Sequence, residues 1–379
     1  MTKFVDKLRL RGSTPKPLSS GFYVYHSPES EPVQFRLHLR VEPDGEGVLI
    51  VNASSILHLN QTATEFAYYL MQGKSESQIT EKVAERFNAP AGIIAQDVAS
   101  FHEQLMTFVH KSDQEPITNF GFEPLTEFTD LSAPYRLDCC LTHRAKSADA
   151  GIDQADFSAE LDTNAWKDII HKAYNAGIPH LVFYGGEPTL REDLIPLLQY
   201  CEELGLVTGL VSSGEKLCDD SYLGSMLTSG LDHLLIPYDP GDAHLKQALT
   251  KILPLDLYTC VNLIIGKDTD YQTLVKELAD LGTNAISIVP ANQEAYEHYL
   301  EAAEFITNSN IPLVSDLPLP KAQIELAKLR NNAAEPQPET EYVIVGVQPD
   351  GEVFSHPFFG KPLGNIATET WDKIWDRRF

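Results

Sequence analysis

The sequence predicts an α/β protein, with a partial (β/α)6 barrel preceded by a winged-helix-like domain and followed by a short C-terminal hairpin. Between residues 135 and 315, short apolar runs alternate with helix-like periodicity, which favours parallel strands joined by right-handed crossovers. Residues 34 to 111 contain three strand-like stretches and then three helical ones. Near residue 350, Pro-Asp-Gly separates two alternating apolar runs, which is typical of a β-hairpin.

Composition limits the classes of partner. The 379 residues predict two or three domains, and 29 basic against 54 acidic residues give a formal charge of −25. This charge argues against nucleic acid or an anionic membrane as a partner. No apolar run approaches the ~20 residues that a membrane-spanning helix needs, and the N-terminus lacks the apolar stretch of a signal peptide. We therefore expect a soluble, cytoplasmic protein.

The same patterns set the expected order of domains. An N-terminal arm covers 1–33, the winged-helix-like domain 34–111 and a linker 112–134. The barrel covers 135–315, and a C-terminal extension covers 316–379.

The N-terminal domain is expected to contain a three-stranded sheet and three helices. Apolar and polar residues alternate in its first strand, and Asp44-Gly45 forms a turn after it. Ser75 and Gln78 have the spacing of a capping box and open the second helix. The expected strands are 35–41, 48–51 and 56–59, and the other two helices are 62–72 and 93–109.

In the barrel, six apolar runs are candidate parallel strands. A helical stretch, 165–177, separates the first two, and another, 273–282, the last two. The five cysteines lack the spacing of a metal site, so buried thiols are expected. The candidate strands are 135–141, 180–184, 207–213, 233–237, 257–265 and 285–290.

The stretch FYGGEPTLRED, 183–193, forms the corner between the second strand and the next helix. Gly185 and Gly186 permit positive φ and let another group approach the backbone closely. That group is either a ligand or a neighbouring strand. Thr189 and Glu192 have the spacing of a capping box, which predicts the helix start there. Because ligand sites collect at the carboxyl ends of barrel strands, this corner is a candidate binding site.

Three stretches in this order resemble known modules and together cover nearly the whole chain. YRLDCCLTHRAKSADAGI with FYGGEPTLRED resembles the opening of radical S-adenosylmethionine (SAM) enzymes. VGVQPDGEVF, LGNI and DKIW resemble the start of the SPASM or twitch extension of peptide-modifying members, here truncated. LHLNQTATEFAYYLMQG and AQDVASF resemble a PqqD-type peptide-recognition domain, also called a RiPP recognition element.

The cysteine pattern departs from this resemblance. Family enzymes hold an iron-sulfur cluster on C-x3-C-x2-C after the first strand, and those places fall on Ala145, Asp149 and Ile152. Iron-sulfur clusters need thiolate ligands, and a lone carboxylate suits harder ions. His356 stands where the first cysteine of the extension is expected. The resemblance therefore implies a degenerate, cluster-less member, for which we expect no catalytic residues, no metal ligands and no radical chemistry.

The resemblance leaves SAM as a possible ligand, although no cofactor is required and loss of the cluster should weaken binding. The GGEP corner matches the family's site for the methionyl amino group. Two serines end the next strand near the expected ribose, and residues of the last two strands lie near the rest of SAM. Each has an alternative role, since serines cap turns and asparagine satisfies backbone groups. The candidate residues are Gly185, Gly186, Glu187, Ser212, Ser213, Asn262 and Val289.

Two classes of function remain open. The first is a non-catalytic peptide-binding or scaffold protein in ribosomal peptide modification, which binds a leader or precursor peptide or an active maturase. An extended peptide would join a sheet edge as an added strand, in a groove beside the third helix, 93–109. The second is a cluster-independent SAM-binding enzyme or sensor. A radical enzyme with unusual ligands is a third reading with little support in the sequence.

Overall fold

The computed structural model describes residues 16–52, 55–110, 131–144, 160–314, 344–355 and 360–378. The chain forms two compact units, Met1–Glu123 and Pro124–Phe379. Several predicted segments lie outside the described residues: residues 1–15 of the arm, most of the linker, and residues 316–343 of the C-terminal extension. His356 also lies outside them.

Within the described residues, the first unit contains an antiparallel sheet of four strands, not the predicted three. The additional strand comes from the stretch that we assigned to an N-terminal arm. Its sequence, GFYVYH, shows no alternation of polar and apolar residues, because aromatic or aliphatic side chains lie on both faces of the strand. The Tyr23 ring, for instance, makes a T-shaped contact with the Tyr68 ring, with centroids 5.0 Å apart. The strands, in sheet order, are β1 (Gly21–His26), β2 (Arg36–Val41), β3 (Gly47–Val51) and β4 (Ser55–Leu59).

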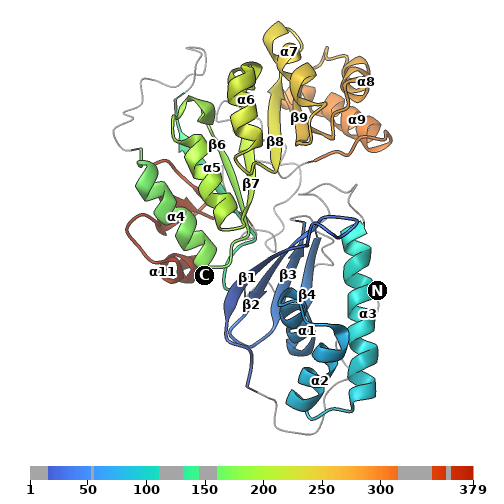
Figure 1. The fold of residues 1–379 in the computed structure, drawn as a ribbon. Helices are drawn as coiled ribbons and strands as arrows, with labels where there is room; N and C mark the ends of the chain where they lie inside the picture. The colour runs from blue at the N-terminus through green and yellow to red at the C-terminus, as the bar shows by residue number, and fades with distance from the viewer. Residues whose placement is uncertain are drawn as a thin grey trace. The chain divides into compact units, whose positions relative to one another are not determined.

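Three helices pack with this sheet, as predicted (Figure 1): α1 (Gln61–Met71), α2 (Glu76–Arg86) and α3 (Ala91–His110). The capping box predicted from Ser75 and Gln78 is confirmed, with both reciprocal hydrogen bonds present. One core joins sheet and helices, and its fully buried members include Leu37, Leu39, Leu49, Phe66, Val83 and Leu105.

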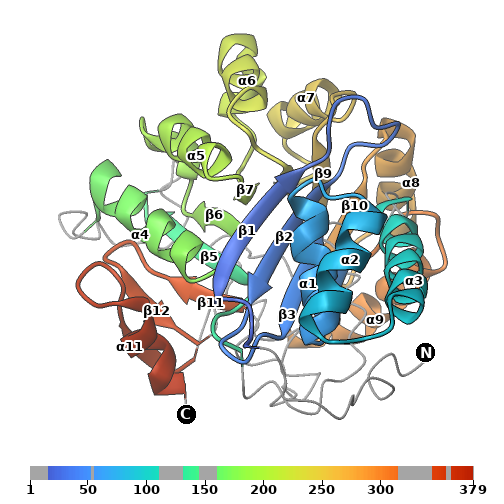
Figure 2. The same cartoon turned by 60° about the horizontal axis from the view of Figure 1, so that its bottom comes forward.

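The second unit contains the six predicted parallel strands, paired in chain order, with helices on the outer side of the curved sheet (Figure 2). β5 carries β11 (Ile344–Val347) on its free side, so no β5–β10 pair closes the barrel among the described residues. The parallel strands are β5 (Arg136–Thr142), β6 (His180–Gly185), β7 (Val207–Val211), β8 (His233–Tyr238), β9 (Tyr258–Ile265) and β10 (Ala285–Pro290). The helices are α4 (Thr163–Asn175), α5 (Leu194–Glu203), α6 (Asp220–Leu227), α7 (Ala243–Ile252), α8 (Tyr271–Leu281) and α9 (Tyr296–Thr307).

The hairpin predicted around Pro-Asp-Gly is confirmed. β11 pairs antiparallel with β12 (Glu352–Phe354), which pairs with β13 (Pro362–Asn365), and Gly351 in the turn has a φ of 87°. The C-terminal helix α11 (Trp371–Trp375) follows. Lys172 on α4 donates to the carbonyls of Ile366 and Glu369, which fixes this extension to the barrel unit.

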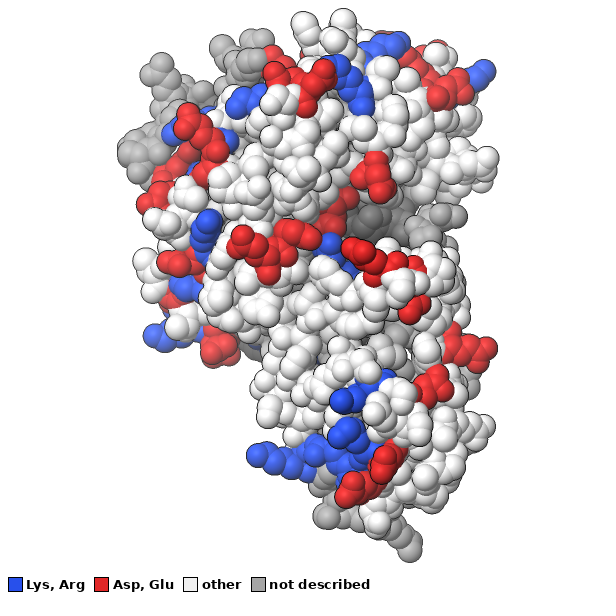
Figure 3. Space-filling view, in the orientation of Figure 1, with Lys and Arg blue, Asp and Glu red and all other residues white. Residues whose placement is uncertain are grey.

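The alternation of side chains gives the barrel sheet two different faces. Leu137, Leu181 and Phe183 belong to the fully buried apolar face that suits amphipathic helices. The opposite face is polar at the start of the strands, where Arg136 pairs with Asp138 at 2.8 Å. Acidic side chains are spread over the visible surface of both units (Figure 3), consistent with the formal charge of −25.

Candidate functional site

The two glycines of the GGEP corner lie against the backbone at the end of β5 and just after it. A Cβ at Gly185 would stand 2.2 Å from the carbonyl oxygen of Thr142, and one at Gly186 would stand 2.1 Å from that of Arg144. The Gly186 amide donates to Thr142 O at 2.9 Å, and the Glu187 amide donates to Arg144 O at 2.8 Å. The group that approaches this backbone is therefore the neighbouring strand, one of the two alternatives left open by the sequence.

Glu187 organises the corner through its buried carboxylate. Oε1 accepts hydrogen bonds from Ser212 Oγ at 2.9 Å and from Thr189 Oγ1 at 2.6 Å, and Oε2 accepts one from the Ser213 amide at 2.7 Å. Five of the seven predicted site residues are thus gathered at the carboxyl ends of β6 and β7. Both carboxylate oxygens already have internal donors, so a ligand ammonium would have to share them.

The capping box predicted at Thr189 and Glu192 is wrong. Thr189 lies inside a short 3-10 helix, Pro188–Leu190, and Asp193 is the N-cap residue of α5. The Glu187 carboxylate accepts the Thr189 amide at 3.0 Å, so it caps the short helix from before Pro188 and leaves Thr189 no capping role.

The other two predicted residues lie farther along the sheet. Asn262 on β9 is fully buried and donates to Ser287 Oγ at 3.3 Å, while its Oδ1 has no hydrogen-bond partner within the described residues. Val289 on β10 is fully buried two residues beyond Ser287, on the same face of the strand. Within the described residues, the Asn262 side chain is hydrogen-bonded to Ser287 and not to the Glu187 group.

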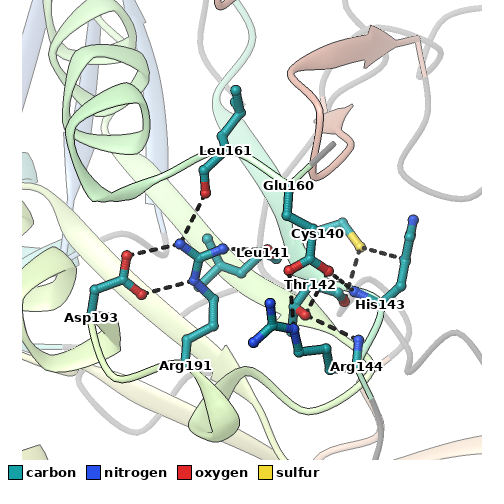
Figure 4. Close-up of polar contacts among 9 residues, drawn as sticks. All are labelled: Cys140, Leu141, Thr142, His143, Arg144, Glu160, Leu161, Arg191 and Asp193. Carbon is teal, nitrogen blue, oxygen red and sulfur yellow. Dashed lines mark hydrogen bonds and ion pairs between the residues drawn. The ribbon is translucent and has the colours of Figure 1, made fainter. Parts of the chain in front are cut away.

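A second polar group, which sequence reasoning missed, surrounds the end of β5 (Figure 4). Thr142 Oγ1 and the His143 amide donate to Glu160 Oε1 at 2.8 and 2.9 Å. Arg144 Nε lies 3.6 Å from Glu160 Oε2, and the Arg144 amide donates to Thr142 Oγ1 at 3.0 Å. Residues on both sides of 145–159 are thereby joined by the Glu160 carboxylate. We call Thr142, His143, Arg144 and Glu160 the loop-base group.

Arg191 connects this region to the start of α5. Its guanidinium donates to both carboxylate oxygens of Asp193 at 2.8 Å and to the carbonyls of Leu141 and Leu161 at 3.0 and 3.1 Å. Burial alone would raise the pKa of Asp193, but hydrogen bonds from Arg191 and Thr163 outweigh it and hold that pKa below its ordinary value. The Arg191 guanidinium thus joins β5, the approach to α4 and the approach to α5.

The donor atoms near β5 do not fit an iron-sulfur cluster. Cys140 Sγ lies 3.8 Å from His143 Nδ1, while Cys139 is fully buried and points to the opposite face of the strand, where burial raises its thiol pKa well above the ordinary value. The family's ligand positions, outside the described residues, carry Ala145, Asp149 and Ile152. Three thiolates are not available to such a cluster. Within the described part of the chain, no group of three or more His, Cys, Asp or Glu side chains is placed to hold a metal ion.

The starts of the barrel strands carry a third polar group, also missed. His233 on β8 is 1% exposed, and its ring centroid lies 4.9 Å from that of His180. Neither Nδ1 nor Nε2 of His233 has a hydrogen-bond partner within the described residues. Burial first, and then the charge of Arg136, lower the pKa of His233 to about 3. The imidazole is therefore neutral, and it packs onto Gly209, where a Cβ would stand 2.0 Å from Nε2.

Residues 46–107 match the family model described as Coenzyme PQQ synthesis protein D (PqqD). The chain carries a PqqD-type domain. The match spans β3, β4 and the three helices up to Thr107, which lies in α3, so it confirms the domain that the sequence resemblance indicated.

Curated relatives match parts of this chain. The PqqA peptide cyclase of Methylobacterium nodulans is 28% identical over 195 residues, which cover 46% of this chain and 51% of the relative. The PqqA peptide cyclase of Methylorubrum populi is 35% identical over 119 residues, 30% of each chain. The chain thus spans about half or less of the length of these relatives.

Solved structures of Streptococcus suis SuiB share the fold. SuiB bound to S-adenosylmethionine superimposes with a TM-score of 0.56 at 14% identity, over 94% of this chain and 91% of SuiB. SuiB bound to its precursor peptide SuiA gives the same score and identity over 90% and 89%. The chain therefore has the radical SAM-type fold that the sequence predicted. Among its described helices, none is both long and apolar enough to cross a lipid bilayer.

Proposed function

We propose that this protein is a pseudo-radical-SAM protein that binds a peptide during ribosomal peptide modification and does no radical chemistry itself. The observation that carries the proposal is β4, an edge strand of the sheet in a PqqD-type domain. An edge strand can accept an extended peptide through main-chain hydrogen bonds, and this needs no metal. The partner is a leader or precursor peptide, presented to or shared with an active maturase.

The relatives support this assignment. Two curated relatives are named PqqA peptide cyclases, and one SuiB structure contains the precursor peptide SuiA. The donor atoms argue against catalysis, since the cluster positions lack thiolates and radical cleavage of SAM depends on that cofactor. The C-terminal hairpin would then belong to a SPASM-like extension, and residues 316–379 contain no cysteine to bind a cluster.

Two measurements on the purified full chain test the proposal. The chain is first reconstituted anaerobically with iron and sulfide, and both elements are then quantified; we expect no stoichiometric incorporation. It is also immobilised and used to select from a displayed library of random 12-residue peptides, and we expect saturable binders. Stoichiometric iron and sulfide would overturn the non-catalytic assignment, and a library without binders would overturn peptide recognition.

A second candidate function is a cluster-independent SAM-binding enzyme or sensor. The buried Asn262 Oδ1 favours it, because an unpaired buried acceptor suits a ligand donor. Calorimetric titration of SAM into iron-free protein tests it, with Asn262→Leu as the variant and Ser221→Ala, on α6, as the control. Micromolar binding that weakens in Asn262→Leu alone would support this function, while no heat of binding would exclude it.

A further inference from the structure

The last strand of the C-terminal hairpin, β13, lies at one end of the nine-stranded sheet. On one side it pairs with β12, and just beyond it the Ile366 amide donates to Gly351 O at 2.9 Å. Backbone groups of successive residues alternate between the two sides of a strand, so Leu363 and Asn365 direct theirs away from β12. No other described strand pairs with that side. An open strand edge is a template for pairing with another chain.

An ion pair between Glu369 and Arg377 covers this edge. The Asn365 amide donates to Glu369 Oε1 at 3.0 Å, and Arg377 Nη1 donates to Leu363 O at 2.8 Å. Arg377 also donates through Nη1 and Nη2 to the two carboxylate oxygens of Glu369, so the ion pair is bidentate. The outward donor of Asn365 and the outward acceptor of Leu363 are therefore both satisfied by side chains that follow β13 in the chain.

Gly364 makes room for the ion pair against the strand. A Cβ at this position would stand 2.3 Å from Arg377 Nη1 and 2.6 Å from Glu369 Oε1, and the residue has a φ of 144°. The missing side chain thus lets both charged groups lie over the backbone. The hydrogen bond from Arg377, and next that from the Asn365 amide, lower the pKa of Glu369 to about 2, so its carboxylate stays ionised at neutral pH.

We propose that the Glu369–Arg377 ion pair is an edge cap that keeps this chain from self-association, and that without it β13 pairs antiparallel with β13 of a second copy. This property goes beyond the proposed peptide binding and does not depend on it. The groups under the cap are complementary to each other. With a twofold axis at Gly364, the Asn365 amide of each copy would donate to Leu363 O of the other.

The same symmetry limits the size of the assembly. Gly364 would stand opposite Gly364 of the second copy, in a non-hydrogen-bonded pair whose Cα atoms lie about 4.5 Å apart. Neither glycine carries a side chain, so the two backbones meet there without a clash. Because this pairing uses the β13 edge of both copies, association should stop at a dimer and not continue to a fibre.

Salt should strengthen this contact. The Arg377 and Glu369 side chains are 47% and 26% exposed, so added salt screens the ion pair of the cap. Salt also screens the repulsion between two chains that each have a formal charge of −25. Both effects favour pairing of the two edges, whereas a contact held together by opposite charges would weaken as salt is added.

The test compares two arginine substitutions that change the charge of the full chain equally. Arg377→Leu removes the donor to Leu363 O, and Arg378→Leu is the control because Arg378 packs on the Trp375 ring and donates to Trp375 O. In sedimentation equilibrium, we expect Arg377→Leu to dimerise with a Kd about tenfold or more below that of the wild type and of the control. Its dimer should become tighter between low and high salt. Circular dichroism checks that both variants fold.

Hydrogen exchange locates the contact. The backbone amides of 363–366 should exchange more slowly as the concentration of Arg377→Leu rises, because the dimer protects them. If Arg377→Leu does not fold, Glu369→Gln takes its place, since it breaks the ion pair with little change of shape, and the same results are expected. The proposal is overturned if the folded variant associates no more than the wild type, if Arg378→Leu associates equally, or if association leaves exchange at 363–366 unchanged.

Discussion

Glu160 accepts a hydrogen bond of 2.8 Å from the hydroxyl of Thr142, which joins the end of β5 to the residues before α4. Radical SAM relatives, by resemblance, would place cluster ligands between these two residues. In this chain, the described connection is a hydrogen bond between two side chains, and Thr142 is fully buried. We therefore expect the loop-base group to stabilise this part of the barrel through protein hydrogen bonds.

Replacing the two partners tests this support. Thr142→Val conserves side-chain volume but leaves Glu160 Oε1 and the Arg144 amide each short of one partner, so the free energy of unfolding should fall by about 1–3 kcal/mol. All three tryptophans, Trp166, Trp371 and Trp375, lie in the second unit, so their fluorescence during urea unfolding reports on that unit alone. A double-mutant cycle with Glu160→Leu should show coupling of about 0.5–3 kcal/mol. Additive effects, or a wild-type melting temperature lowered by a metal chelator, would contradict a protein-only connection.

Arg191 should contribute more than Arg144 to the stability of the same region. Arg191 is nearly buried and makes four hydrogen bonds, two of them to carbonyls, whereas the Arg144 side chain is 53% exposed and 3.6 Å from its carboxylate. Arg191→Leu leaves the partly buried Asp193 carboxylate without its cationic partner and with only the Thr163 hydroxyl as a side-chain donor, so we expect a loss of about 2–5 kcal/mol. Arg144→Leu should cost less than about 1 kcal/mol. The tryptophan unfolding assay measures both, and equal losses would show that the Arg191 contacts add little.

The glycine corner predicts opposite effects for two glycine-to-alanine substitutions. Gly186→Ala places a Cβ 2.1 Å from Arg144 O, a backbone atom that cannot move without shifting the end of β5, so it should destabilise the second unit. Gly224 lies within α6, and its Cβ would meet no atom within 4 Å. Gly224→Ala should stabilise the same unit by up to about 1 kcal/mol. A Gly186→Ala variant as stable as the wild type would mean that the backbone at Arg144 shifts to accommodate the added Cβ at little cost in free energy.

Local patterns were sufficient to predict most of the architecture. The six barrel strands, the PqqD-type helices and the Pro-Asp-Gly hairpin each carry a complete signal in contiguous residues, and the structure confirms them. β1 was missed because GFYVYH has no polar alternation, and its pairing with the predicted strand β2 is a contact that no local pattern encodes.

The site residues were predictable only where a motif identified them. The FYGGEP motif led to Glu187 and to the serines that end the next strand, which its carboxylate does contact. Glu160 belongs to no motif used in the sequence analysis, and Arg191 lies within FYGGEPTLRED but was given no role there. The partners of both residues are set by strand register and by the path of the chain after β5. The capping-box spacing at Thr189 was misleading because a nearer carboxylate, Glu187, takes the Thr189 amide.

His233 makes the stability of the barrel unit depend on pH. Its pKa is lowered to about 3 in the folded chain, by burial and then by Arg136, whereas an unfolded histidine has a pKa of about 6.5. Between these values the unfolded state binds a proton that the folded state does not, so stability falls as the pH falls. The contribution is fully present above about pH 6.5 and changes by up to about 1.4 kcal/mol per pH unit below it.

His233→Leu removes this titration and should flatten the pH dependence between about pH 6.5 and 4.5 by up to one proton. Asp138 and His180 lie in the same buried group and remain unchanged in the variant, so the difference between the two curves isolates His233. The measurement is urea unfolding followed by tryptophan fluorescence at several pH values, with both proteins compared at pH 7.5 to separate the packing effect of the substitution. Parallel curves for wild type and variant would mean that His233 is protonated, or equally hydrated, in the folded state.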